Sequence, residues 1–265
     1  MTLEPIPPVP PTLARLTEAA EVAFITEQNR AASQLYPDDG FIAESLGTGV
    51  VAITKPSFSR IKILTLERLF RGINLPPYIN LCPFSHPTAR QLFNERGYFV
   101  RGAISVYTLP LQDYENDKND NDDNIEITCV QDTEKALFTE YSITGAKSLG
   151  RAVDLLETLA KCATLRPDTR LYFAKIDGQI AGSAGLAFLT TPFGQVAELY
   201  IDSTVPEFRG RGVQTALLRA RLVEAKKAGV ERAVLNARPG EGSARNAERV
   251  GFQLAYVKDT LTKVG

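Results

Sequence analysis

The 265-residue sequence contains no tryptophan, one methionine, one histidine and three cysteines. Cys82, Cys129 and Cys162 lie far apart and form no Cys-x-x-Cys pair, which argues against a zinc site and against a disulfide framework. The single histidine, His86, has no Gly-x-Ser-x-Gly sequence to accompany it in a hydrolase-type triad. We therefore predict that His86 is a surface or helix-capping residue, and that the protein holds no metal.

The sequence also lacks a strong net charge and long hydrophobic runs. A net charge of −1 gives no bulk attraction to nucleic acid or to an anionic membrane. No apolar run approaches the roughly 18 residues that suggest a membrane span. The first eleven residues have neither the basic nor the hydrophobic region of a secretory signal. We expect a cytoplasmic protein without nucleic-acid or membrane partners, and its oligomeric state stays open.

One segment is almost free of apolar residues. Residues 113–124, DYENDKNDNDDN, cannot bury enough surface to offset their ordering entropy. Oxygen-bearing side chains alternate there as in a calcium loop, but Asp122 replaces the turn glycine and Thr128 replaces the final glutamate. This pattern favours a linker between two domains, residues 1–112 and 125–265.

The most informative segment is VPEFRGRGVQTALL, which begins at Val205 and follows an apolar run typical of a strand. A glycine-rich turn at the start of a helix directs backbone N–H groups and the positive end of the helix dipole at one point, where phosphate binds. Arg209 and Arg211 add positive charge and favour a diphosphate. The sequence contains neither G-x-x-x-x-G-K-[ST] nor G-x-G-x-x-G, which excludes the P-loop and the dinucleotide fingerprint.

This turn resembles the acetyl-CoA pyrophosphate motif, [QR]-x-x-G-x-[GA], of the GNAT superfamily of acetyl-CoA-dependent N-acetyltransferases. Arg209 and Gly212 fill the first and fourth positions, whereas Gln214 stands where the family has Gly or Ala. The Gln214 side chain would either crowd the diphosphate or hydrogen-bond it. The resemblance implies acetyl-CoA as the cofactor, bound by Thr204, Val205, Arg209, Gly210, Arg211, Gly212, Val213, Gln214, Thr215 and Asn246. For Asn246, a simple helix-surface role is the alternative.

The segments around the turn predict an α+β fold. Hydrophobic periodicity and turn signals predict helices near 133–143 and 149–162, strands at 171–176, 179–189 and 195–205, a helix at 214–228, a strand at 232–236, a helix at 243–250 and a strand at 254–263. The resemblance covers residues 125–265 and implies a mixed, mostly antiparallel sheet flanked by helices. The predicted helix 214–228 has an apolar stripe, with Arg219 and Arg221 largely off it.

Residues 12–112 contain a weak internal repeat. The segment Thr88–Tyr98 resembles the segment Ser243–Phe252. Each pattern predicts a helix that ends in glycine and an aromatic residue and is followed by a strand. Further helices are predicted within 13–35 and 61–70, and two strands within 40–54. We interpret residues 1–112 as a degenerate GNAT-like domain without its own cofactor site, in tandem with the C-terminal one. Two unrelated α+β domains are the alternative.

The resemblance also implies direct attack of an amine on a thioester, which needs a general base and gains from a proton donor. Glu198, eleven residues before Arg209, is the first candidate for the base. Glu198, Tyr200 and Asp202 share one face of a regular strand, so Asp202 is the reserve. The alternative is that these residues form a solvated polar face.

The proton donor departs from the family pattern. Many relatives carry a tyrosine four residues before the Gly-Phe pair, where this sequence has Ala247. Tyr256 on the last strand is the substitute candidate. Two functions stay open: an N-acetyltransferase acting on a primary amine of a small molecule, amino acid or peptide, and a non-catalytic regulatory protein that binds coenzyme A or an acyl-CoA.

Overall fold

The computed structural model describes residues 9–37, 67, 77–115, 124–147 and 153–263. The strands predicted within 40–54, nearly all of segment 61–70 and the middle of the predicted linker lie outside these residues.

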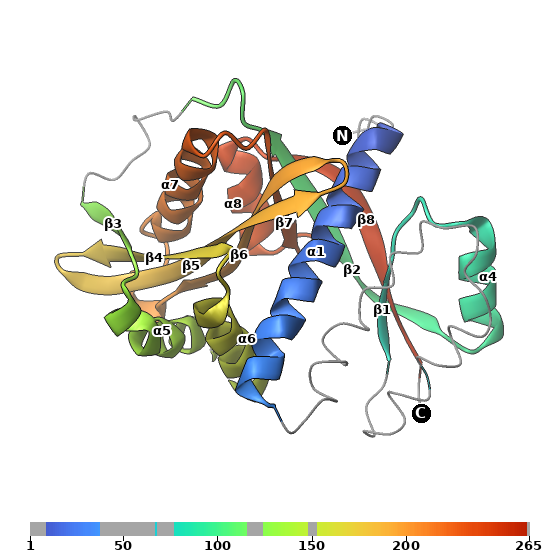
Figure 1. The fold of residues 1–265 in the computed structure, drawn as a ribbon, viewed down its shortest axis with the longest axis horizontal. Coiled ribbons are helices and arrows are strands. Elements are labelled where there is room, and N and C mark those ends of the chain that lie inside the picture. Colours follow the sequence, from blue (N-terminus) through green and yellow to red (C-terminus); the bar gives the residue numbers. More distant parts are fainter. Residues whose placement is uncertain (1–8, 38–66, 68–76, 116–123, 148–152, 264–265) are drawn as a thin grey trace.

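The described elements keep the predicted order, but the strands at Tyr78–Leu81 and Ile125–Cys129 were not predicted (Figure 1). They are α1 (Pro11–Leu35), β1 (Tyr78–Leu81), α4 (Pro87–Glu95), β2 (Phe99–Pro110), β3 (Ile125–Cys129), η2 (Asp132–Glu134), α5 (Lys135–Lys147), α6 (Val153–Leu165), β4 (Thr169–Ile176), β5 (Gln179–Thr191), β6 (Gly194–Thr204), η3 (Pro206–Phe208), α7 (Val213–Lys227), β7 (Arg232–Ala237), α8 (Gly242–Val250) and β8 (Gln253–Thr262). The predicted capping role of His86 is confirmed, because its side chain accepts from the backbone N–H of Thr88 at the start of α4.

All described strands join one eight-stranded sheet in the order β1-β8-β2-β7-β6-β5-β4-β3. Only β6 and β7 run parallel, and every other neighbouring pair is antiparallel. The mixed, mostly antiparallel sheet flanked by helices is therefore as predicted.

Strands from the two halves of the sequence alternate at one end of this sheet. β2 lies between β7 and β8, and β1 pairs with the other edge of β8. The N-terminal strands thus continue the same sheet as the C-terminal ones. The division into a degenerate GNAT-like domain and a C-terminal domain stays a prediction.

Helices cover both faces of the sheet. On one face, Ala197 and Leu199 of β6 belong to the main core cluster with Leu217 and Leu222 of α7. On the other face, Val196 packs in a cluster with Ala20 of α1. Since side chains alternate along a strand, this places α7 and α1 on opposite faces. Figure 1 shows α1 crossing the strands, with α6 beside it and α5 next to α6. Among the described helices, none is long and apolar enough to cross a bilayer.

Two sequence-based expectations about α7 and β6 are wrong. Arg221, expected off the apolar stripe, is fully buried and bonds Asp202 of β6 and the carbonyl of Gly185 on β5. Asp202 reaches α7 because Ile201 adopts a left-handed conformation (φ 53°) beside a register shift between β5 and β6. Such a bulge inserts an extra residue and reverses the alternation beyond it. Glu198 and Asp202 therefore do not share a face.

Candidate active site

The site lies where the parallel strands β6 and β7 separate. Their pairing covers only three residues of each strand and ends at Glu198 opposite Val234. Both strands continue past this point, β6 to Thr204 and β7 to Ala237. In the part of the chain that the structure describes, the two strands therefore form a fork with Glu198 at its vertex.

The glycine-rich turn closes the open end of the fork. Gly210 and Gly212 both have φ of +76°, a left-handed conformation that side chains other than glycine rarely adopt. Gly212 is the N-cap of α7 and has no side-chain cap, so the first N–H groups of α7 point out of the helix end toward the turn. Backbone N–H groups in this arrangement can bind phosphate, and phosphate binding at this turn stays a prediction.

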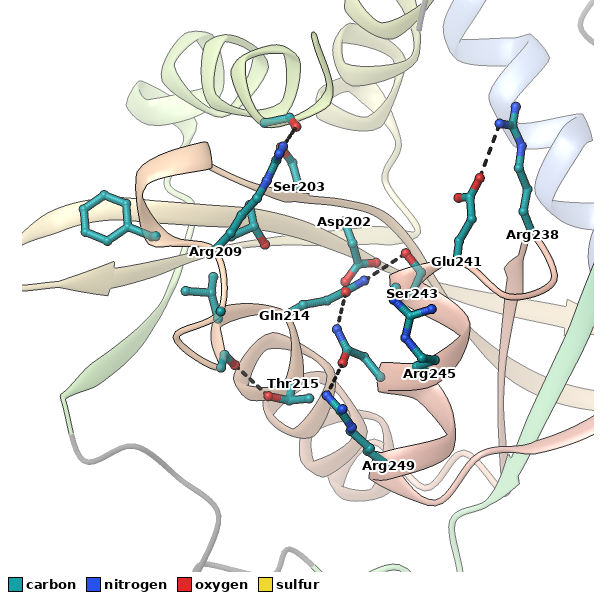
Figure 2. Close-up of a pocket in the computed structure, with 18 residues that line it drawn as sticks. Asp202, Ser203, Arg209, Gln214, Thr215, Arg238, Glu241, Ser243, Arg245 and Arg249 are labelled. Atoms are coloured by element: carbon teal, nitrogen blue, oxygen red, sulfur yellow. Dashed lines mark hydrogen bonds and ion pairs between the residues drawn. The ribbon is translucent and has the colours of Figure 1, made fainter. Parts of the chain in front are cut away.

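A cavity of about 740 Å³ lies in front of this turn (Figure 2). It is lined by the end of β6, the turn, the start of α7, Arg238 just after β7, α8 and the residue before it, and Gly145 of α5. Eight of the predicted cofactor-binding residues line it: Thr204, Arg209, Gly210, Gly212, Val213, Gln214, Thr215 and Asn246. Val205 and Arg211 do not line it, because Val205 is buried behind the turn and the Arg211 guanidinium lies over the ring of Phe208.

Gln214, the departure from the family motif, links α7 to α8 across the cavity floor. Its side-chain carbonyl accepts from Asn246 at 2.7 Å, and its amide donates to Ser243 at 3.3 Å. Figure 2 shows this chain of bonds continuing to Arg249, which donates to Asn246 at 3.2 Å. Asn246 is thus part of the cavity wall.

Gly145 allows α5 to approach the end of β6 very closely. A Cβ at this position would lie 2.9 Å from the backbone N and O of Thr204, and nearer still to the hydroxyl of Ser203. Arg209 also donates to the carbonyl of Gly145 at 2.9 Å. α5 therefore fixes both the strand end and the first arginine of the motif.

Three arginines on the β7–α8 side were not predicted as site residues. Arg238 follows β7, and Arg245 and Arg249 lie on α8; all three are exposed and line the cavity. In Figure 2 they lie on the other side of Gln214 from Arg209. The sequence signal that could have identified them is the placement of Arg245 and Arg249 four residues apart, on one face of the helix that follows β7. The lining holds these three arginines and Arg209 against Asp202 and Glu241, so its net charge is positive.

Glu198 is buried at the vertex, with only 5% of its surface exposed. Its Oε1 accepts from the side-chain amide of Asn236 at 3.0 Å, and its Oε2 has no hydrogen-bond partner. Burial is the main cause that raises the pKa of Glu198 to about 8; the negative charge of Glu21 adds to the rise, and Lys258 opposes it. A carboxyl with this pKa is largely protonated at neutral pH and becomes available as a base as the pH rises through about 8.

Tyr256, the predicted proton donor, lies apart from Glu198. They are on β8 and β6, separated by β7 and β2, which corresponds to roughly 14 Å at ~4.8 Å per strand spacing. The Tyr256 hydroxyl donates to Glu18 at 2.5 Å and lies 2.7 Å from the Thr17 hydroxyl, both on α1. Burial raises the pKa of Tyr256 far above its ordinary range.

Lys258 completes this buried polar cluster beneath α1. It is 2% exposed and forms ion pairs with Glu18, at 2.6 Å, and with Glu21. The N-terminal helix is thus attached to the last strand by buried charges as well as by apolar contacts. Among the described residues, no group of three or more His, Cys, Asp or Glu side chains is placed to hold a metal ion.

Comparisons with known proteins agree with this geometry. Residues 131–252 match the family described as the Acetyltransferase (GNAT) family. Searched against curated proteins, the sequence has no match.

Several solved structures share the fold. A GCN5-related N-acetyltransferase from Kribbella flavida is similar with a TM-score of 0.60 and 14% identity, over 77% of this chain and 75% of that one. A GCN5-related N-acetyltransferase from Sphaerobacter thermophilus gives a TM-score of 0.57 and 16% identity, over 78% and 70% of the two chains. A tandem GNAT protein of the clavulanic acid biosynthesis pathway gives 0.57 and 14%, over 78% and 71%. The family match identifies a GNAT acetyltransferase domain at residues 131–252, and the solved structures share its fold.

Proposed function

We propose that the protein transfers the acetyl group of acetyl-CoA to a primary amine of a small molecule, an amino acid or a peptide. The observation that carries the proposal is that the glycine-rich turn and the end of β6 line one cavity, and that β6 leads from this cavity back to Glu198. Glu198 does not line the cavity itself; it is buried at the vertex of the fork, six residues before Thr204.

The donor groups of the cavity fit coenzyme A. Its volume of about 740 Å³ lies within the usual range of ligand pockets. The N–H groups at the start of α7 and the Arg209 side chain suit a diphosphate. Arg245 and Arg249 provide further positive charge for the remaining phosphate of the cofactor. When bound, acetyl-CoA supplies an acetyl group activated as a thioester.

The fork offers backbone hydrogen-bonding groups to an extended ligand. Past Glu198 and Val234, the facing edges of β6 and β7 no longer pair with each other. Backbone N–H and C=O groups seek partners, so an extended chain lying between the strands would satisfy them. An N–H group aimed into this gap would also stabilise negative charge on a carbonyl oxygen during acyl transfer.

Glu198 acts as the general base in this proposal. An amine attacks only when it is neutral, so a proton must leave the ammonium group first. The Oε2 of Glu198 has no partner and a pKa of about 8, which suits it to accept that proton. Tyr256 is assigned a structural role instead of a donor role, because its hydroxyl is held by Glu18 and Thr17 of α1.

Calorimetric titration with acetyl-CoA tests the proposal, using Gly212→Asp as the disrupting variant. The new Cβ would meet nothing closer than 3.7 Å, but the left-handed backbone strains any side chain there, so the change adds both a carboxylate and backbone strain to the turn. Gly229→Asp is the matched control, because Gly229 has φ of +78° and lies just beyond the opposite end of α7. We expect saturable binding by the wild type and by Gly229→Asp, and loss of binding by Gly212→Asp.

Transfer itself is measured by release of free thiol in the presence of candidate amines. Glu198→Gln should bind acetyl-CoA normally and lose most of the turnover, because the base contributes about 10²- to 10⁴-fold. Absence of acetyl-CoA binding at millimolar concentration would refute the proposed function.

A further inference from the structure

The side chain of Asn236 forms a bond across the fork that sequence reasoning did not anticipate. Asn236 lies on β7, two residues beyond Val234, the last residue of β7 that pairs with β6. Its amide donates to Oε1 of Glu198 at 3.0 Å. The side-chain bond therefore replaces the backbone ladder at the point where the ladder ends.

The two partners have very different environments. Glu198 is 5% exposed, whereas Asn236 is exposed. Val234 belongs to the cluster beneath α1, so Asn236, two residues further along the strand, faces the same side. Asn236 is thus the exposed end of a polar path that leads to the buried carboxyl.

The bond fixes which oxygen of Glu198 is available. Oε1 is engaged by Asn236, and Oε2 is buried without a hydrogen-bond partner. Nearby charges come from three other elements: Glu21 on α1, Lys258 on β8, and Arg166 just after α6. A buried polar atom without a partner is uncommon, and a catalytic role is one of the recognised reasons for it.

We propose that Asn236 is a positioning residue for the reaction: it holds Glu198 at the fork vertex with Oε1 engaged, so that Oε2 faces the incoming amine and receives its proton. The inference rests on the proposed function, because it needs Glu198 to be the base. Hydrogen bonding to a carboxylate favours its ionised form, so the amide of Asn236 also opposes the effect of burial on the pKa of Glu198.

Two substitutions test the bond. Asn236→Leu removes the donor and keeps a similar volume. Asn236→Asp keeps the shape and replaces the donor with a second carboxyl that would compete for a proton. Asn80→Asp is the control for introducing a carboxyl on a strand, because Asn80 lies on the edge strand β1 and its side-chain oxygen accepts from the Thr260 hydroxyl, a role that aspartate retains.

The first readout is the pH profile of kcat/KM. In Asn236→Leu we expect the acidic limb to move up by about half to one pH unit, and in Asn236→Asp by more. Asn80→Asp should keep the wild-type limb. A limb that stays at the wild-type position in both Asn236 variants, at normal folding stability, would overturn the proposal.

The second readout does not need turnover. Carboxyl ¹³C NMR follows the titration of Glu198 in the unliganded protein, with the resonance assigned by its absence in Glu198→Gln. An upward shift of this titration in Asn236→Leu supports the link, and an unchanged titration refutes it. Wild-type turnover by Glu198→Gln would instead show that Glu198 is not the base, and the proposed chemistry would fail separately.

Discussion

The buried state of Glu198 predicts an unusual dependence of stability on pH. The pKa of this carboxyl is about 8 in the folded protein, against an ordinary value of 4.5. The folded state therefore binds the proton more tightly than the unfolded state does. Its stabilising contribution is complete below pH 4.5 and is lost progressively as the pH rises toward 8.

The size of the effect follows from the shift. Each pKa unit corresponds to about 1.4 kcal/mol, so the whole range amounts to about 5 kcal/mol, and the part between pH 5 and pH 9 to about 4 kcal/mol. Glu198→Gln cannot ionise and lacks this term. We expect the free energy of unfolding of the variant to gain about 4 kcal/mol relative to the wild type between these two pH values.

Urea unfolding at pH 5, 6, 7, 8 and 9 measures the difference at each pH. Any fixed cost of placing an amide at this buried position is the same at every pH and cancels from the slope. Glu95→Gln, on the exposed face of α4, is the control and should show no comparable slope. A constant difference between Glu198→Gln and the wild type from pH 5 to pH 9 would refute the reasoning.

Three further changes test the packing around the site. Asp202→Asn leaves the fully buried Arg221 guanidinium without its counter-charge and should cost about 3–5 kcal/mol in denaturant unfolding; a loss below about 1 kcal/mol would contradict the role of the pair. Gly145→Ala forces α5 away from Thr204, and it should weaken acetyl-CoA binding in calorimetry more than it lowers the melting temperature; unchanged affinity would show that the close approach does not matter. Arg245→Gln combined with Arg249→Gln removes two positive charges from the cavity wall and should weaken coenzyme A binding about tenfold at low salt and less at high salt, whereas salt-independent loss would point to a structural defect.

Local patterns predicted most of the elements. Apolar periodicity located α7 and β8 to within a residue or two, and the Asp177-Gly178 pair marked the β4–β5 hairpin. The Arg-Gly-Arg-Gly turn predicted a phosphate site at the start of α7, because glycine conformation and the helix terminus depend only on neighbouring residues. Eight of the ten predicted cofactor-binding residues line one cavity for the same reason.

Period-two alternation failed at β6 because a bulge is set by the neighbouring strand and helix. Asp202 faces α7, where Arg221 neutralises it, and the left-handed Ile201 makes this reversal possible. Nothing in the sequence of β6 alone specifies the extra residue. For the same reason, Arg221 looked like a surface residue of an amphipathic helix and is in fact a buried counter-ion.

The sequence by itself determined most of the helices and strands of residues 125–265, the glycine-rich turn and the resemblance to a GNAT acetyltransferase, since each depends on residues close together in the chain. The tertiary structure alone decided that β2 is inserted between β7 and β8, that α1 covers the face bearing Glu198, and that Asn236 binds that carboxyl. These contacts join residues between 38 and more than 200 positions apart, as in Glu198 with Asn236 and Glu18 with Tyr256. The pKa of Glu198 depends on such contacts because desolvation and neighbouring charges raise or lower it. Both are set by which residues lie nearby in the folded protein, not by which are adjacent in the sequence.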